Sequence, residues 1–113
     1  MADRSTKTEI TPLELKAKLD RGDKPLILDI REPYELPISA LPEFKHIPMG
    51  QVVQRMPELE SYKESEVVVV CRSGQRSGVI ADYMRQKGFS KVYNLTGGLN
   101  EWADTVDRNM QKY

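Results

Sequence analysis

The chain has 113 residues, and its 17 basic and 17 acidic side chains give a formal net charge of zero. This balance argues against a nucleic-acid or membrane surface, because both rely on a basic excess. One cysteine and one histidine cannot form an internal disulfide or a metal-ligand cluster. Residues 1–7 lack the apolar core of a signal peptide, so we expect a cytoplasmic protein. The length suits a flexible segment at residues 1–8 and one domain at residues 9–113.

Helical and strand patterns alternate along the first half of the chain. A capping box at residues 11–14 predicts a short helix that ends near Gly22, and an apolar run at residues 26–30 predicts a strand. Residues 31–48 hold four of the seven prolines, which favours turns with at most one short helix. Apolar spacing predicts a helix over residues 51–62 that its internal proline bends or interrupts.

The second half continues the alternation. Valines at residues 67–70 predict a buried strand, residues 79–87 a helix, and residues 91–95 another strand. A last helix is expected around Trp102, which we interpret as a core anchor, and the polar tail at residues 107–112 should fray or dock loosely. Strands separated by helices predict a parallel sheet with ligands at the carboxyl ends of its strands.

The single cysteine lies at the predicted turn between a strand and a helix. Cys71 follows the valine run and opens a loop that contains Arg72 and Arg76. At such a turn, free backbone N–H groups and the helix dipole favour an anion, and two arginines add positive charge. An inert core cysteine would need neither arginine, whereas a reactive cysteine needs a lowered pKa. The pattern therefore predicts a nucleophilic thiolate at Cys71.

Four residues separate Cys71 from Arg76, and this six-residue loop resembles the active-site loop of rhodanese domains, which carry sulfur as a cysteine persulfide. Cysteine-based phosphatases and arsenate reductases use a loop one residue longer, so those activities fit less well. Three further segments resemble rhodanese signatures: Leu-Asp-Ile-Arg-Glu-Pro-Tyr-Glu at residues 28–35, His-Ile-Pro at 46–48 and Gly-Gly-Leu-Asn-Glu-Trp at 97–102. The segments at 47–50, 56–59 and 111–113 are similar to the rhodanese domain of adenylyltransferases that activate ubiquitin-like sulfur carrier proteins.

The resemblance implies an α/β, rhodanese-like three-layer fold with about five mainly parallel strands and helices on both faces. It also implies a thiosulfate sulfurtransferase that needs no cofactor besides the persulfide on Cys71. The expected partners are a small anionic sulfur donor and a thiophilic acceptor such as a sulfur carrier protein or its adenylyltransferase, with no nucleic acid and no membrane. Because the chain has one cysteine, the acceptor must come from outside.

The charge pattern assigns roles to the residues of the predicted site. Arg72 would bind the sulfonate of the donor, and Arg76 would stabilise the loop and the anionic sulfur and hold carbonyl or carboxylate groups. Asp29 would accept hydrogen bonds from loop amides, while Arg31 and Glu35 are spaced for an ion pair on one helical turn. The backbone amides that would hydrogen-bond the outer sulfur belong to Ser73, Gly74, Gln75 and Ser77.

A binding module is the alternative to an enzyme. Some rhodanese-like domains dock partners or sense reactive sulfur without turnover, and many of these lack the loop cysteine. This chain has Cys71 together with Arg72 and Arg76, so the sequence favours the enzyme. The resemblance places His46 in a structural turn, so we expect it to pack or to form hydrogen bonds and not to catalyse.

Overall fold

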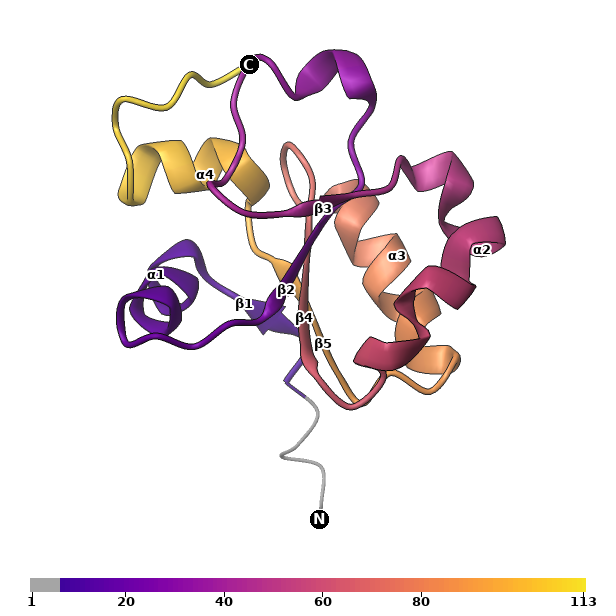
Figure 1. Ribbon diagram of the computed structural model, residues 1–113. Coiled ribbons are helices and arrows are strands. Elements are labelled where there is room, and N and C mark those ends of the chain that lie inside the picture. Colours follow the sequence, from indigo (N-terminus) through magenta and orange to yellow (C-terminus); the bar gives the residue numbers. More distant parts are fainter. Residues whose placement is uncertain (1–6) are drawn as a thin grey trace.

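Parallel strands form the centre of the molecule, and helices cover both faces of the sheet (Figure 1). The computed structural model describes residues 7–113, so residues 1–6 of the expected flexible segment lie outside the described part. Within that part, the sheet has the order β1-β5-β4-β2-β3, and all neighbouring strands are parallel. The strands are β1 (Glu9–Ile10), β2 (Leu26–Asp29), β3 (Lys45–His46), β4 (Glu66–Val70) and β5 (Lys91–Leu95). The expected parallel α/β sheet of about five strands is confirmed.

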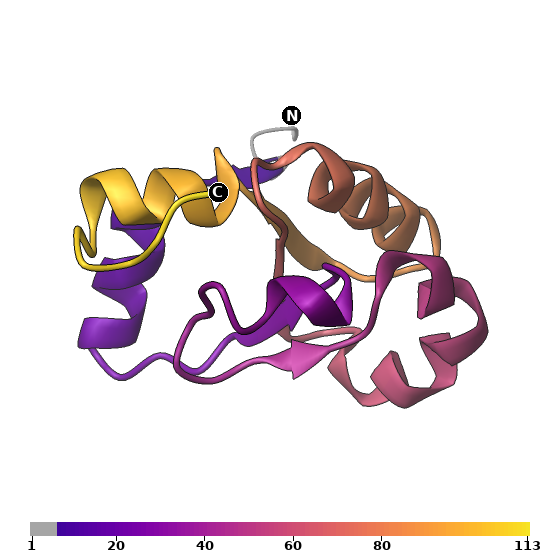
Figure 2. The ribbon, with the colours of Figure 1, turned by 90° about the horizontal axis from the view of Figure 1, so that it is seen from above.

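The helices form the two outer layers of the fold (Figures 1 and 2). One face carries α1 (Pro12–Asp20) and α4 (Gly98–Thr105), and the other carries α2 (Val52–Arg55) and α3 (Gln75–Gln86). Short 3-10 helices occupy the connections: η2 (Pro33–Glu35), η3 (Met49–Gln51) and η4 (Met56–Tyr62). None of the helices found in residues 7–113 is long and apolar enough to cross a membrane.

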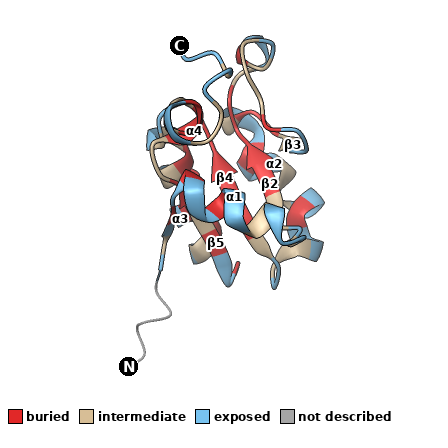
Figure 3. Cartoon of the chain, turned by 90° about the vertical axis from the view of Figure 1, so that its left-hand side faces the viewer, coloured by how far each residue is buried: buried red, intermediate tan, exposed pale blue. Residues whose placement is uncertain are grey.

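The valines of β4 alternate between two apolar layers. Val67 and Val69 face the layer beneath α2 and α3, whereas Val68 and Val70 face the layer beneath α1 and α4. All four are at most 1% exposed, and burying each contributes about 1.5 to 3 kcal/mol to folding. The strands accordingly lie in the buried centre, with exposed residues on the outer faces of the helices (Figure 3). The chain therefore leaves β4 inside the protein, and Cys71 follows directly.

Local signals in the sequence fix several element boundaries. The capping box is present, because Thr11 Oγ accepts a hydrogen bond from Glu14 N at 3.1 Å and Thr11 N donates to Glu14 Oε1 at 2.9 Å. Pro57 lies where α2 gives way to η4, as the interrupted helix predicts. Gly88 follows α3 with φ of 98°, the left-handed conformation that suits a glycine.

The structure differs from the prediction in two places. α3 begins at Gln75 and not at residue 79, because Gly74 at φ of 95° acts as its N-cap and brings Arg76 into the first helical turn. The edge strands β1 and β3 are not predicted, since a strand of two residues has no alternation to recognise. Of the two alternatives for the polar tail, docking is the one observed, because Lys112 on the tail pairs with Asp104 at 2.9 Å.

Candidate active site

The sulfur of Cys71 lies in a cradle of hydrogen-bond donors at the N-terminus of α3. Cys71 is 1% exposed, and its Sγ accepts hydrogen bonds from Gly74 N at 3.1 Å and from Ser77 N at 3.4 Å. The dipole of a 12-residue helix has its positive end here and also favours a thiolate. The side chains of Ser73 and Gln75, two other residues of the predicted cradle, are exposed at its rim.

The start of α4 holds the backbone of the cysteine loop. Leu99 N donates to the carbonyl of Cys71 and Asn100 N donates to the carbonyl of Arg72, each at 3.0 Å. The close approach depends on Gly98, where an added Cβ would lie 2.4 Å from the Arg72 carbonyl oxygen and 2.6 Å from that of Cys71. Gly98 also has φ of 63°, so the Gly-Gly turn serves both the conformation and the contact.

A buried polar chain leads from the sulfur to the edge of the sheet. Ser77 Oγ lies 3.2 Å from Cys71 Sγ and donates to Asn94 Oδ1 at 2.5 Å. Asn94 Nδ2 in turn donates to Gly74 O and to the carboxylate of Glu9. Since the Ser77 hydroxyl has one proton, it can serve Asn94 or the sulfur, and only the amides are permanent donors to sulfur. Sequence reasoning missed Asn94, whose only signal is a polar residue in an apolar strand.

The carboxylate of Glu35 neutralises Arg76. Arg76 Nη1 and Nη2 donate to the two oxygens of Glu35 at 2.8 and 3.0 Å, the bidentate arrangement that guanidinium groups favour. The predicted ion pair between Arg31 and Glu35 is therefore wrong. Arg31 is fully buried and pairs instead with Asp29, whose Oδ2 accepts from Nη2 at 2.9 Å and whose Oδ1 accepts from the Arg31 backbone at 3.1 Å.

Contacts of Arg31, His46 and Trp102 support the loops around the site. Arg31 Nη2 also donates to the Ser39 carbonyl at 2.7 Å, so the buried pair with Asp29 holds residues 36–44 near the end of β2. His46 Nε2 lies 2.6 Å from the Arg31 carbonyl, which fits the structural role that the sequence predicts for this histidine. Trp102, 5% exposed, packs in the apolar layer under α1 and α4.

Tyr113 enters the site from the far end of the chain. Its hydroxyl donates to Glu35 Oε1 at 2.6 Å and accepts from Arg31 Nη1 at 2.8 Å. Its ring centroid lies 5.0 Å from the guanidinium carbon of Arg72, within the range of a cation–π contact. Only the likeness of residues 111–113 to related domains hinted at this position, because a contact across 78 residues leaves no local pattern.

Burial and hydrogen bonding together set the pKa values of the site. Burial raises the pKa of the Cys71 thiol, but donors from Ser77, Gly74 and Ser73 outweigh it, and the net pKa is lowered. The hydrogen bonds from Arg76, helped by Tyr113, lower the pKa of Glu35 from 4.5 to about 2. Burial and the neighbouring Glu35 raise the pKa of the Tyr113 phenol, so it stays protonated and remains a donor at neutral pH.

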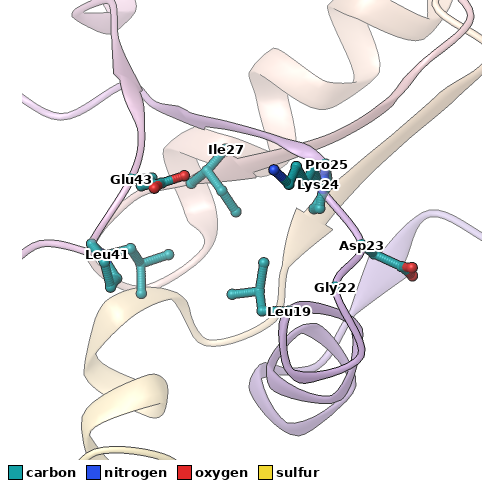
Figure 4. Close-up of a pocket in the computed structure, with 9 residues that line it drawn as sticks. Leu19, Gly22, Asp23, Lys24, Pro25, Ile27, Leu41 and Glu43 are labelled. Carbon is teal, nitrogen blue, oxygen red and sulfur yellow. The ribbon is translucent and has the colours of Figure 1, made fainter.

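A separate cavity of about 320 Å³ lies on the α1 side of the sheet (Figure 4). Leu19, Pro25, Ile27 and Leu41 supply much of its apolar lining, and no residue of the cysteine loop contributes to it. Cys71 does not line it. The candidate active site is therefore the cradle of Cys71 and not this cavity.

Comparison with known proteins shows the family. The rhodanese-like domain family matches residues 11–105, so the chain belongs to the rhodanese-like domains. It is 37% identical to a sulfurtransferase of Allochromatium vinosum over 84% of this chain and 87% of that one. It is 34% identical to the adenylyltransferase and sulfurtransferase MOCS3-2 of Zea mays over 92% of this chain. The predicted likeness to rhodanese domains of adenylyltransferases is confirmed.

Solved structures confirm the three-layer fold. The structure of a rhodanese-like domain protein from Staphylococcus aureus matches with a TM-score of 0.76 and 29% identity, covering 94% of this chain and 98% of that one. Several relatives are much longer. The chain spans 23% of the Zea mays protein and 40% of a rhodanese-like/PpiC domain-containing protein from Arabidopsis thaliana.

We predict that Gly98→Ala disrupts the site and the fold together. The new methyl group would collide with two loop carbonyls at a residue with positive φ, which should cost about 2 kcal/mol or more. Urea unfolding and the rate of Cys71 alkylation measure the two effects. Gly50→Ala is the matched control, because a Cβ at Gly50 meets no atom within 4 Å and should change stability by less than about 0.5 kcal/mol. Equal stabilities of the two variants would contradict the assigned contact.

We predict that the alkylation of Cys71 by iodoacetamide titrates with a midpoint below the value near 8.5 of a free cysteine. The reason is that cradle donors stabilise the thiolate more than burial destabilises it. The measurement is the second-order rate constant against pH. Ser77→Ala removes the hydroxyl, which can turn its proton from Asn94 to the thiolate, and should raise the midpoint, while both amide donors remain. A parent midpoint at or above the free-cysteine value would mean that burial dominates.

We predict that ionised Glu35 stabilises the fold above about pH 4.5 and that this contribution is lost as the pH falls toward 2. The sign follows because the pKa of Glu35 is lower in the folded protein than in the unfolded chain. Glu35→Gln has no such titration. Urea midpoints of the parent and the variant should therefore converge as the pH is lowered through this window. A difference that stays constant between pH 5 and pH 2 would contradict the pairing with Arg76.

Proposed function

We propose that this protein is a sulfurtransferase that carries sulfane sulfur as a persulfide on Cys71. The supporting observation is the pair of amides, from Gly74 and Ser77, directed at a sulfur beside the exposed Arg72. Donors that the fold holds in place stabilise developing negative charge without reorganisation. Membership of the rhodanese-like family and the named sulfurtransferase relative support the same activity.

The proposed first step takes sulfur from an anionic donor such as thiosulfate. The Cys71 thiolate attacks the outer sulfur, a new S–S bond forms, and the S–S bond of the donor breaks. The electron pair of that bond leaves with sulfite, and Cys71 retains the sulfur as a persulfide anion. No net charge is lost in this exchange, so donors to sulfur and a cation for the leaving group are both needed.

The two loop arginines divide these tasks. Arg72 is exposed, and within residues 7–113 it forms no ion pair, so its full charge is available to the sulfonate. Arg76 has both terminal nitrogens on Glu35, so its main contribution is to hold the first turn of α3 against η2. Arg76 would therefore stabilise the anionic sulfur by charge–charge attraction and not by a hydrogen bond from its terminal nitrogens.

An external nucleophile completes the proposed cycle. It attacks the outer sulfur, breaks the persulfide bond and returns the electron pair to Cys71 as a thiolate. The chain has no second cysteine to resolve the persulfide. The Zea mays relative is named both an adenylyltransferase and a sulfurtransferase, which supports a sulfur carrier protein or its adenylyltransferase as the natural partner. A cytoplasmic location would keep the thiol reduced between turnovers.

The expected result is that the purified protein forms thiocyanate from thiosulfate and cyanide, and that Cys71→Ser abolishes this activity. The thiolate is the only sulfur acceptor in the mechanism, and a hydroxyl cannot replace it. Colorimetric detection of thiocyanate measures turnover, and circular dichroism checks that the variant folds. Substantial turnover by the serine variant would contradict the mechanism.

A second measurement distinguishes the enzyme from a binding module. Mass spectrometry of the parent after incubation with thiosulfate should show the addition of one sulfur atom, and cyanide should remove it. A module that only docks partners would gain no sulfur, whereas a sensor of reactive sulfur would gain it without forming thiocyanate catalytically. Either result would refute the proposed activity.

A further inference from the structure

The last described residue is fixed by three hydrogen bonds. Tyr113 donates its backbone N–H to Asn100 Oδ1 at 3.1 Å, and its hydroxyl bridges Glu35 and Arg31 at 2.6 and 2.8 Å. Tyr113 is half-buried, whereas the two residues before it are exposed. These hydrogen bonds to the folded domain therefore fix the position of the Tyr113 ring.

The same asparagine fixes Arg72 and Tyr113 relative to each other. Asn100 N donates to the Arg72 carbonyl at 3.0 Å, and the Asn100 side chain accepts from Tyr113 N at 3.1 Å. The guanidinium of Arg72 then lies over the tyrosine ring, 5.0 Å from its centroid. In Figure 1 the C-terminus accordingly lies at the end of the molecule where the parallel strands end.

A carboxylate partner cancels the net charge of an arginine, whereas an aromatic partner does not. Glu35 holds Arg76 by cancelling its charge with two charged hydrogen bonds. An aromatic face attracts a guanidinium group through its quadrupole and leaves the net positive charge in place. Among the described residues Arg72 has this partner and no carboxylate partner. The ring can therefore restrict the side chain of Arg72 and preserve its attraction for an anion.

We propose that Tyr113 is a positioning residue for anion recognition, whose ring holds the charged Arg72 beside the cradle of Cys71. The inference rests on the proposed function for its natural substrate, an anionic sulfur donor. The hydroxyl has a separate task, because it completes the hydrogen bonding of Glu35 and of the buried Arg31. Loss of the ring should weaken anion selectivity, and loss of the hydroxyl alone should mainly lower stability.

The test compares the alkylation of Cys71 by anionic iodoacetate and by neutral iodoacetamide. The ratio of the two rate constants reports the positive charge at the cradle and does not require sulfurtransferase turnover. Arg72→Ala should lower this ratio about five-fold or more. Tyr113→Leu should lower it about two- to five-fold and raise the KM for thiosulfate by a similar factor, with a smaller change in kcat. Gln111→Ala, an exposed uncharged neighbour, should keep the parent ratio.

Two further variants separate the ring from the hydroxyl. Tyr113→Phe keeps the ring and should stay closer to the parent ratio than Tyr113→Leu, while its melting temperature falls by about 4 °C or more. In the Arg72→Ala background, Tyr113→Leu should lower the ratio no further, because its target is gone. An unchanged ratio in a folded Tyr113→Leu variant, equal losses in Tyr113→Phe and Tyr113→Leu, or a further loss in the double variant would each overturn the inference.

A failure of the proposed function can be distinguished from a failure of this inference. If the parent forms no thiocyanate, the KM for thiosulfate cannot be measured, but the alkylation ratios still compare the same variants. Melting curves for every variant show whether a changed ratio reflects the site or a loss of folded protein. The positioning of Arg72 can thus be supported or overturned whether or not thiosulfate is a donor.

Discussion

The cradle of Cys71 depends on two backbone hydrogen bonds from the start of α4. Leu99 N donates to the carbonyl of Cys71 and Asn100 N donates to the carbonyl of Arg72, so both carbonyls point toward α4. The amides that follow in the loop are then free to turn to the sulfur. Only a glycine at position 98 allows this approach, because a Cβ would lie within 2.6 Å of both carbonyl oxygens. The pairing of β4 with β5 brings the two segments together, so the site is an outcome of the sheet order.

The surroundings give two similar arginines different chemistry. Arg76 meets a carboxylate whose pKa it lowers to about 2, so this pair stays ionised and structural across neutral pH. Arg72 meets an aromatic ring and keeps its net charge. Burial separates them as well, since Arg72 is exposed and Arg76 is only half-exposed. A cation that the protein has already neutralised adds rigidity, and one that it has not neutralised can bind substrate.

Much of the fold can be predicted because its signals are local. The capping box, the valine run and the glycine after α3 each act within a few residues, and each forms as the sequence predicts. Side-chain pairing is harder, since the choice of Asp29 over Glu35 by Arg31 depends on which group the fold buries beside it. Asn94 and Tyr113 join the site through contacts over 17 and 78 residues. The periodicity of a single sequence does not reveal contacts between residues that lie so far apart along the chain.

The burial of Cys71 determines what kind of stabilisation its sulfur can use. At 1% exposure the thiolate receives little help from water, and burial alone would raise its pKa. The fold supplies amide donors and a helix terminus instead, which need no reorganisation when charge appears. These donors are neutral, so they stabilise charge on sulfur without fixing a counterion beside it. In the proposed mechanism, the net positive charge of Arg72 is then left for the second anion, which is the leaving group of the sulfur donor.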